Sequence, residues 1–472
     1  MLFNSYGFIF IFLPITFFVY FYLNNKKLTK ASKSFLVASS LFFYSWWNII
    51  YLPLLLISIL FNYTIGSILS GEKDSRNVSK KKLLTFGIIG NISLLAYFKY
   101  ADFFIENINF ITTSNIPTLD LVLPLALSFF TFQQIAYLVD SYRKETKEYG
   151  FLNYVVFVSF FPQLIAGPIV HHKEMMPQFS KVKNKLINYK NIALGLLIFS
   201  IGLFKKVIIA DTFAIWATHG FDVAEKLNFI EAWATSLSYT FQLYFDFSGY
   251  TDMAIGIALL FNIKLPINFN SPYKATDIQD FWRRWHITLS RFLRDYVYIP
   301  LGGNRKGNFR TYTNLLATFV IGGLWHGAGW TFIFWGFLHG FGLGIHRVWQ
   351  KIGFKLNIVI AWFLTFNFVN IAWIFFRAKE WEDAIKILKG MTGIMGIGSL
   401  STLISFADIN AFQLLYMLIV ILITCVTIFM KNTNSLNYHD MKKKKMYIGI
   451  ALLLWISILH LNRVTEFLYF NF

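Results

Sequence analysis

Long apolar runs recur from one end of the chain to the other, and they constrain its fold more than any other feature. The first, FIFIFLPITFFVYFYL, covers residues 8–23. Runs of about 18 residues or more are long enough to cross the hydrocarbon core of a bilayer. Only 14% of the residues are charged, against roughly 25% in soluble domains. We therefore predict an all-α, polytopic membrane protein. A β-barrel would need shorter strands that alternate apolar and polar residues.

The runs predict a series of helices that together leave no room for a soluble domain, so we expect one membrane-embedded domain over residues 1–472. Residues 152–166 and 281–299 are expected to be re-entrant or interfacial. The second segment is amphipathic, since it mixes arginines with tryptophans and leucines. The candidate helices are 6–24, 34–49, 52–70, 83–100, 122–141, 152–166, 191–217, 228–262, 281–299, 312–328, 330–349, 357–377, 412–430 and 446–462.

The distribution of basic residues predicts the orientation in the membrane. Loops 25–34, 71–82, 143–148 and 440–445 are basic, whereas no Lys or Arg lies between Lys99 and Arg143. Because basic loops stay on the cytoplasmic side, residues 101–121 and both termini are expected to be periplasmic. The net charge of +19 therefore indicates contact with anionic lipid rather than a nucleic-acid partner. The first helix lacks the basic start and cleavage site of a signal peptide, and we expect it to be retained.

His326 is the first candidate for chemistry. It follows Trp325 in an otherwise apolar helix, and glycines 322, 323, 327 and 329 surround it. An imidazole is costly in a membrane unless it faces protein or a wet cavity. With an ordinary pKa of about 6.5, it could serve as a general base toward a hydroxyl group. The alternative is a histidine that only joins two helices by a hydrogen bond.

His286 is the second candidate and lies in the sequence RWHITLS of the amphipathic segment. Interfacial helices carry polar residues in any case, so a purely structural histidine remains an alternative. The neighbouring basic residues, together with Gly302 and Gly303, resemble a surface that accepts phosphate groups, since arginine grips phosphate with two parallel hydrogen bonds. An ordinary positive cytoplasmic loop would look the same. The basic residues are Arg283, Arg284, Arg291, Arg294, Arg305 and Lys306.

Three polar residues, Asp246, Ser248 and Asp252, interrupt a long apolar helix. Carboxylates buried in a membrane are expensive and are normally paired. The basic residues between 283 and 294 are plausible partners. A structural ion pair and a direct part in catalysis both remain open.

A second polar region follows the Pro/Gly-broken segment 162–169, which is typical of backbone that lines a cavity at membrane depth. His171 and His172 come directly after it. No cysteine and no carboxylate beyond Glu174 completes a ligand set there, so we expect no metal site and no bound cofactor. His339 and His346 share one helix face, and capping or an interface accounts for His346.

Several motifs together resemble the membrane-bound O-acyltransferase family, in particular the bacterial branch that acetylates alginate and peptidoglycan. The matching segments occur in order over most of the chain, and the long one is very specific. Ala126 stands where the family pattern leads us to expect glycine. The segments are 124–143, 160–170, 244–261, 268–307, 322–340 and 373–384.

The resemblance implies a helical bundle with a tunnel across the bilayer. It makes His326, in the Trp-His-Gly motif, the catalytic histidine and His286 a second tunnel residue. It also suggests that further residues contact substrate or the tunnel, namely Trp325, Asp246, Ser248, Asp252 and Trp285. Residues that could bind donor phosphates are Arg305, Lys306 and Arg284.

The implied function is that of an inner-membrane O-acetyltransferase. It would take acetyl from a cytosolic thioester, acetyl-CoA, and pass it across the membrane to a periplasmic glycan. Peptidoglycan is favoured over alginate or another exopolysaccharide. The chain is rich in Lys, Asn, Ile and Phe, which indicates an AT-rich genome, whereas we associate alginate producers with GC-rich genomes. Since no periplasmic domain is expected, a separate SGNH-type transferase is the expected partner. A transporter of an acetyl carrier without covalent chemistry and a scaffold of an export complex are the alternatives from other classes.

Overall fold

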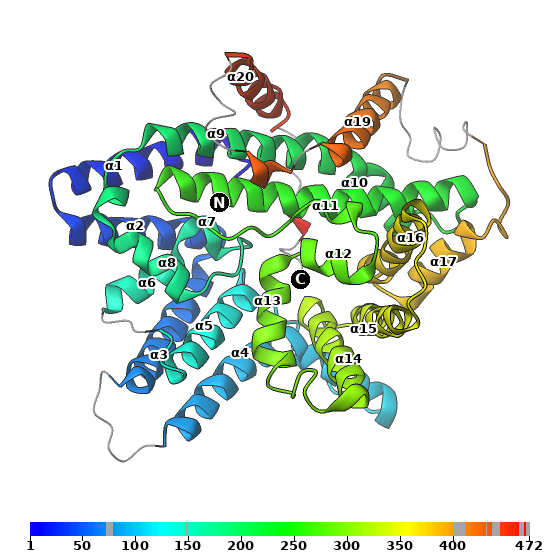
Figure 1. Ribbon diagram of the computed structural model, residues 1–472, viewed down its shortest axis with the longest axis horizontal. Helices are drawn as coiled ribbons and strands as arrows, with labels where there is room; N and C mark the ends of the chain where they lie inside the picture. Colours follow the sequence, from blue (N-terminus) through cyan, green and yellow to red (C-terminus); the bar gives the residue numbers. More distant parts are fainter. Residues whose placement is uncertain are drawn as a thin grey trace. The chain divides into compact units, whose positions relative to one another are not determined.

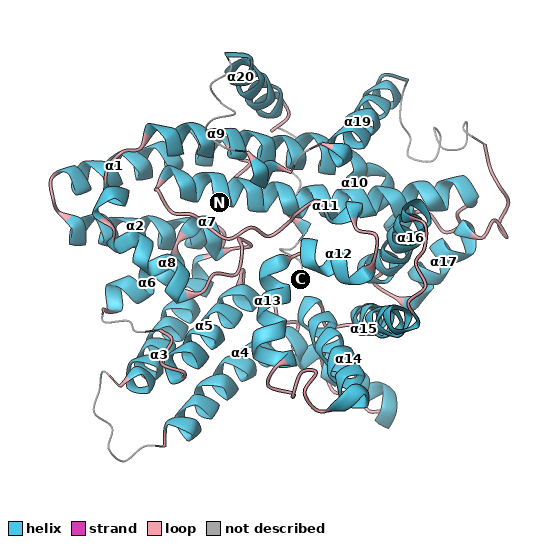
Figure 2. Cartoon of the chain, viewed as in Figure 1, coloured by secondary structure: helices cyan, strands magenta, loops and turns pink. Residues whose placement is uncertain are grey.

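The computed structural model describes residues 1–71, 79–146, 150–399, 411–430, 432–436, 444–461 and 467–468. Throughout these ranges every regular element is a helix, as Figure 2 shows, so the all-α class is confirmed. The helices form two compact units. The first comprises Met1–Ser200, Tyr250–Pro266 and Asn437–Ile450, and the second comprises Ile201–Gly249, Ile267–Leu436 and Ala451–Phe472. The single domain over residues 1–472 stays a prediction.

Among the residues that the structure describes, five helices are long and apolar enough to cross a membrane, judged by length and composition. They are Phe8–Asn25, Ile49–Ser70, Lys80–Thr112, Tyr189–Val223 and Ile358–Arg377. Two shorter apolar helices lie at Leu414–Ile428 and Tyr447–Leu459. Other predicted segments fold into shorter or more polar helices, and the functional candidates lie on these.

The first unit holds the helices drawn in blue to cyan in Figure 1. Contacts between α4 and α5, α1 and α2, and α3 and α5 hold it together. Its packing includes buried polar contacts, for example where the Asn62 and Asn91 amides exchange two hydrogen bonds of 3.1 and 2.7 Å. The bounds are α1 Leu13–Asn25, α2 Thr29–Ser45, α3 Leu52–Ser70, α4 Lys80–Thr112, α5 Leu127–Tyr142, α6 Phe151–Ser159, α7 Phe161–Leu164 and α8 His172–Ser180.

Ala126, directly before α5, explains the glycine expected at this position. Its φ is +64°, in the left-handed region that disfavours any residue with a Cβ by roughly 1–2 kcal/mol. The turn delays the start of the predicted helix 122–141, so α5 begins at Leu127. Glycine would adopt the same turn without that cost.

The second unit contains the α14–α15 pair, which is in extensive contact. In Figure 1 the two helices lie side by side, and α15 lies next to α16. Their backbones touch at Gly323 and Gly336, where an added Cβ would overlap the backbone carbonyls of Phe332 and Phe319. The elements that lie wholly in this unit are α10 Asp211–Thr218, α12 Ile278–Arg284, α13 Ile287–Leu293, α14 Gly307–His326, α15 Trp330–Ile352, α16 Ile358–Arg377, α17 Trp381–Met391 and α19 Ala411–Phe429.

Three helices contribute to both units. They are α9 Tyr189–Phe204, α11 Phe229–Leu260 and α20 Lys444–Leu459. The long α11 confirms the helix predicted over 228–262. It carries the polar residues Asp246 and Ser248 in the second unit and Asp252 in the first.

Several predicted boundaries were wrong, and three segments differ most. The helix predicted over 83–100 continues to Thr112, so only the rest of segment 101–121 is a loop. Residues 152–166 form α6 and α7, which Phe160 separates. The single amphipathic helix predicted over 281–299 is broken at Trp285–His286 into α12 and α13, and a π-helix, Arg294–Tyr298, follows.

Candidate active site

His326 is the last residue of α14, and its buried side chain is 2% exposed. Its Nδ1 lies 2.7 Å from the backbone carbonyl oxygen of Gly322, one turn earlier. Because a carbonyl can only accept, Nδ1 carries the proton and donates it to this bond. In the neutral imidazole, Nε2 therefore carries the lone pair. That is the form a general base needs.

Aromatic rings surround the His326 imidazole. Trp325, Trp335 and Phe376 contact it edge-on, with ring centroids at 4.8, 5.0 and 5.2 Å. Behind them the indole of Trp373 stacks on that of Trp335 at 5.6 Å. The close approach of α14 to α15 at Gly323 brings these rings together. The environment is apolar and dense, which strengthens any hydrogen bond made inside it.

His286 lies in the break between α12 and α13 rather than within a helix, which corrects the sequence prediction. Its φ is +42° and its ψ is +54°, a left-handed conformation that a non-glycine residue adopts at a cost of roughly 1–3 kcal/mol. The side chain is fully buried. Since strained residues persist only where their surroundings hold them, the contacts of His286 must compensate for this strain.

Asn268 supplies the main contact, and the sequence analysis missed it. Its Oδ1 accepts from Nδ1 of His286 at 3.1 Å, and from the backbone N and Oγ1 of Thr288 at 3.2 and 2.9 Å. Three donors around one atom identify it as the amide oxygen. Nδ1 of His286 therefore carries its proton, and the neutral ring has its lone pair on Nε2, as in His326.

The two histidines lie in one cluster of rings. The Trp325 indole contacts both imidazoles, at 6.3 Å for His286 and 4.8 Å for His326. Phe247 packs edge-on against His286 at 4.8 Å. Burial and, after it, the electrostatic effect of His326 lower the pKa of His286 well below its usual value. Both predicted catalytic residues thus come together with Trp325, and His286 is neutral at pH 7.

Trp285, the third predicted tunnel residue beside the histidines, is also buried in this region. Its indole lies 4.8 Å from that of Trp373 and 5.0 Å from the Phe269 ring. The side chain therefore joins the segment before His286 to α16, which carries Trp373. A direct contact with substrate stays a prediction.

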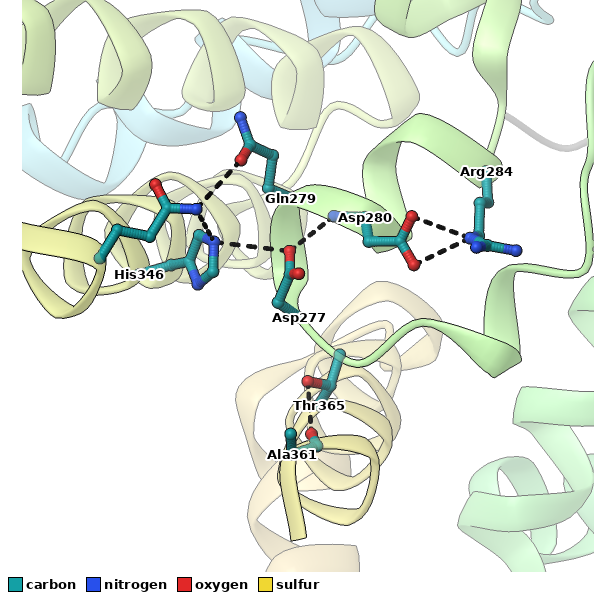
Figure 3. Close-up of polar contacts among 8 residues, drawn as sticks. Asp277, Gln279, Asp280, Arg284, His346, Ala361 and Thr365 are labelled. Atoms are coloured by element: carbon teal, nitrogen blue, oxygen red, sulfur yellow. Dashed lines mark hydrogen bonds and ion pairs between the residues drawn. The ribbon is translucent and has the colours of Figure 1, made fainter. Parts of the chain in front are cut away.

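Polar contacts hold α12 in place just before His286 (Figure 3). The Asp277 carboxylate accepts from the backbone N of Asp280 at 2.7 Å and lies 3.5 Å from Nε2 of His346. His346, for which capping or an interface was expected, thus contacts α12 from α15. Nε of Arg284 donates to both oxygens of Asp280 at 2.9 Å. The predicted phosphate ligand Arg284 already has a carboxylate partner.

Asp246 has a different partner from the one predicted. Its Oδ1 lies 2.7 Å from Nζ of Lys206, which also contacts Oδ1 of Asp211 at 2.8 Å. Its Oδ2 accepts from the backbone N of Leu468 at 3.0 Å. The predicted partners, the arginines between 283 and 294, were wrong. Lys206 lies on a different helix, 40 positions before Asp246, and sequence spacing does not show that the two helices pack together. Asp246 is therefore ion-paired, as expected of a buried carboxylate, and its contact with substrate stays a prediction.

The other two polar residues of α11 are buried as well. Ser248 lies in the second unit with His286 and His326, whereas Asp252 lies in the first. Substrate contact by either one stays a prediction.

The basic loop lies at the opposite end of α14 from His326. Gly302 and Gly303 have φ values of +110° and +55°, and Arg305 and Lys306 are exposed. Gly303 O accepts from Nδ2 of Asn314 at 2.9 Å, which clamps the loop to the start of the helix. With 20 residues in α14 and a rise of about 1.5 Å each, roughly 30 Å of helix separate loop and imidazole. The two predicted sites are distinct.

The His171–His172 pair takes part in a polar contact of the first unit. Nδ1 of His171 lies 3.4 Å from Oδ2 of Asp140, and the amine of Lys173 lies 4.0 Å from the same oxygen. In the described ranges, no group of three or more His, Cys, Asp and Glu side chains could hold a metal ion.

His339, on α15, is a member of the cluster around His326 that the sequence analysis did not single out. Its imidazole is fully buried and lies 4.9 Å from the Trp335 ring, which also contacts His326. Nε1 of Trp282 donates to its Nδ1 at 3.2 Å. Its place in an apolar helix could have suggested it, since ionisable residues in such helices are rare and mostly functional.

Comparison with known proteins now identifies the family. The model of MBOAT, the membrane-bound O-acyltransferase family, matches residues 139–379, which include both histidines of the cluster predicted to be catalytic. The chain belongs to this family. It is an acyltransferase and a multi-pass membrane protein, as its apolar helices and the resemblance predicted.

Relatives in the family transfer different acyl groups. The peptidoglycan O-acetyltransferase of Helicobacter pylori is 51% identical over an alignment of 517 positions, which covers 100% of this chain and 98% of the relative. The probable alginate O-acetylase AlgI of Azotobacter vinelandii is 40% identical over 83% of this chain and 78% of its own. A teichoic acid D-alanyltransferase of Streptococcus thermophilus is 28% identical over 53% of this chain and 68% of its own.

Proposed function

We propose that this acyltransferase takes acetyl from a cytosolic thioester, acetyl-CoA, and passes it across the inner membrane for O-acetylation of peptidoglycan. The observation that carries the proposal is the state of His326. Its Nδ1–H is bonded to Gly322 O, so its Nε2 presents a lone pair in an apolar, ring-lined site. A positioned base of this kind suits attack by a hydroxyl group on an acyl carbon.

In the proposed reaction, Nε2 of His326 removes the proton of the attacking hydroxyl as its oxygen bonds to the acyl carbon. The same nitrogen then returns the proton to the departing thiolate. The dense aromatic wall excludes water, which otherwise would compete with the hydroxyl and hydrolyse the thioester. His286 would bind the substrate or a product in the same cluster, since the Trp325 ring lies against both imidazoles.

Peptidoglycan is favoured as the acceptor, because the Helicobacter peptidoglycan O-acetyltransferase matches over the full length of this chain. Alginate or another exopolysaccharide is the second candidate, supported by the probable alginate O-acetylase at 40% identity. An SGNH-type protein in the periplasm would receive the acetyl group and complete the transfer to glycan. The tunnel expected across the bilayer would connect the two sides.

The test is transfer by the purified protein in detergent. Radiolabelled acetyl-CoA is supplied with either muropeptides or an SGNH-type partner, and labelled ester is counted per folded molecule. We expect transfer with acetyl-CoA and loss of transfer in the His326→Ala variant. Release of labelled ester by that variant at the wild-type rate would contradict the proposed base.

The orientation is tested separately by cysteine labelling. The exposed Cys425 is first replaced by Ser, and single cysteines are placed at Thr113 and Ser79. A membrane-impermeant maleimide should label Thr113→Cys in intact spheroplasts and label Ser79→Cys only after permeabilisation, because basic loops stay cytoplasmic. The reverse pattern would overturn the periplasmic placement of both termini as well.

A further inference from the structure

The cluster around His326 contains buried N–H donors that find no acceptor on the protein. They are Nε2 of His339 and the indole Nε1 atoms of Trp335 and Trp373, and no hydrogen-bond partner is found for them among the residues that the structure describes. All three side chains are at most 1% exposed. An unsatisfied buried donor costs about 1–3 kcal/mol. Three in one cluster indicate a site built to bind a group that accepts hydrogen bonds.

The tautomer of His339 is opposite to that of His326. Nδ1 of His339 accepts from Nε1 of Trp282 at 3.2 Å, and an indole N–H can only donate. The proton of the neutral His339 ring is therefore on Nε2. His326 donates from Nδ1 and has its lone pair on Nε2. One histidine is thus prepared to accept a proton and the other to donate a hydrogen bond.

The donors and the base belong to one packed group of rings. The Trp335 indole contacts His326 at 5.0 Å and His339 at 4.9 Å. Trp373 stacks on Trp335 at 5.6 Å and lies 6.1 Å from His339. The contact between Gly323 and Gly336 fixes α14 against α15, and so fixes His326 relative to His339.

From this arrangement we infer that His339 is a further catalytic residue, which binds the acyl carbonyl oxygen and stabilises the oxyanion formed from it, assisted by the indole N–H groups of Trp335 and Trp373. The ligand class is an acyl carbonyl, which offers acceptor oxygen only. The inference rests on the proposed function, because it takes an acyl thioester as the donor.

The hydroxyl oxygen of the acceptor bonds to the carbonyl carbon, its proton passes to Nε2 of His326, and the carbonyl π electrons move to the oxygen. His339 Nε2–H donates to that oxyanion. When the carbonyl re-forms, the carbon–sulfur bond breaks, and the thiolate takes the proton from His326. Donors aimed at a developing oxyanion are worth about 10²–10³-fold in kcat.

The kinetic test compares His339→Leu, which has no donor, with His339→Gln, whose amide N–H can replace the donor. We expect His339→Leu to lower kcat by about 10²-fold with little change in the KM for the donor, and His339→Gln to restore at least part of it. A purely structural role would lower the amount of folded protein and leave its kcat unchanged. Unchanged kcat in both variants, in a background where His326→Ala is inactive, would overturn the inference and leave the proposed function standing.

A spectroscopic test needs no turnover. The probe is the ketone analogue of acetyl-CoA, in which CH2 replaces sulfur and the carbonyl carbon is ¹³C. Hydrogen bonds lower the carbonyl stretching frequency, so the bound probe should absorb at lower frequency in the wild type than in His339→Leu. Equal frequencies would overturn the inference alone. Failure of the probe to bind the wild type would overturn the proposed donor, and the inference with it.

The indoles are tested by replacing tryptophan with β-(3-benzothienyl)alanine, which keeps the two rings and exchanges N–H for sulfur. At Trp335 or Trp373 the change should slow turnover without lowering thermal stability, because the lost N–H has no protein acceptor. Trp362 is the matched control on the same helix as Trp373. Its Nε1 donates to Tyr273 O at 2.8 Å, so there stability should fall and kcat should hold. The same response at Trp362 and Trp373 would contradict an assisting role.

Discussion

His326 and His286 are both buried, both donate from Nδ1, and both lie against Trp325, yet different parts of the chain hold them. His326 has helical backbone and bonds to the carbonyl of its own preceding turn. His286 has a left-handed backbone and depends on Asn268, 18 residues earlier. The first can form as soon as α14 forms. The second exists only when the segment around Asn268 has packed against α13.

The way each histidine is held suggests a different role for it. A histidine held by its own helix costs little to position and can serve as the reacting base. A histidine held in a strained turn by a distant amide is a point where binding of a ligand and packing of the chain are coupled. The two positions should therefore respond differently to substitution.

The largest effect is expected from His326→Ala. Loss of a positioned base lowers the rate by about 10²–10⁴-fold, and the protein should still fold, because the lost bond is local to the end of α14. Acetyl transfer is measured per folded molecule, with folding followed by size-exclusion chromatography in detergent. Normal specific activity with reduced protein yield would show instead that His326 only joins helices.

A smaller loss, about tenfold, is expected from His286→Asn, since asparagine tolerates the left-handed backbone but lacks the imidazole and its hydrogen bond of about 1 kcal/mol. His286→Gly relieves the strain and should lose activity to the same extent. If both variants kept full activity, the backbone turn and not the ring would be what the site requires.

Asn268→Leu tests the anchor of His286 and leaves the imidazole in place. It removes the acceptor of three donors, so we expect a stability loss of about 1–3 kcal/mol together with reduced kcat. Thermal unfolding and turnover are measured on the same preparation. A stability loss with unchanged kcat would show that His286 needs no fixed orientation.

Substitutions in the basic loop are expected to weaken binding of the donor without slowing the chemical step. Arg305→Ala with Lys306→Ala removes two exposed charges about 30 Å along α14 from His326. We expect a severalfold rise in the KM for acetyl-CoA and an unchanged kcat, because the loop would bind phosphate groups and not the reacting carbon. The rise should shrink at high salt. An unchanged KM would show that the donor phosphates bind elsewhere.

The smallest effect is expected from a variant that measures the free-energy cost of a left-handed backbone like that of His286. Ala126→Gly places glycine at another left-handed position, with φ of +64°, and should stabilise the protein by about 1 kcal/mol without changing activity. Thermal unfolding of the two proteins in the same detergent measures it. A destabilised variant would show that the turn is held without strain, and the cost assigned to His286 would fall accordingly.

Much of the fold followed from the sequence, because it depends on local patterns. The apolar runs predicted the helices, and the spacing of glycines and tryptophans around position 326 drew attention to His326. The breaks at Phe160 and at Trp285–His286 were harder to predict. The apolar pattern continues through both, and only backbone geometry shows where each helix ends.

The sequence by itself determined the helical class, the family and the identity of the two candidate histidines, since these depend on composition, periodicity and short motifs. Tertiary structure decided which residues hold them. Asn268 on His286, Lys206 on Asp246, and Trp282 on His339 are contacts between residues 18, 40 and 57 positions apart. Such pairings leave no periodic signal, because they arise from how helices pack and not from the order of residues within one. The tautomer of His339 follows from such a contact, with Trp282, whereas that of His326 follows from the local bond to Gly322.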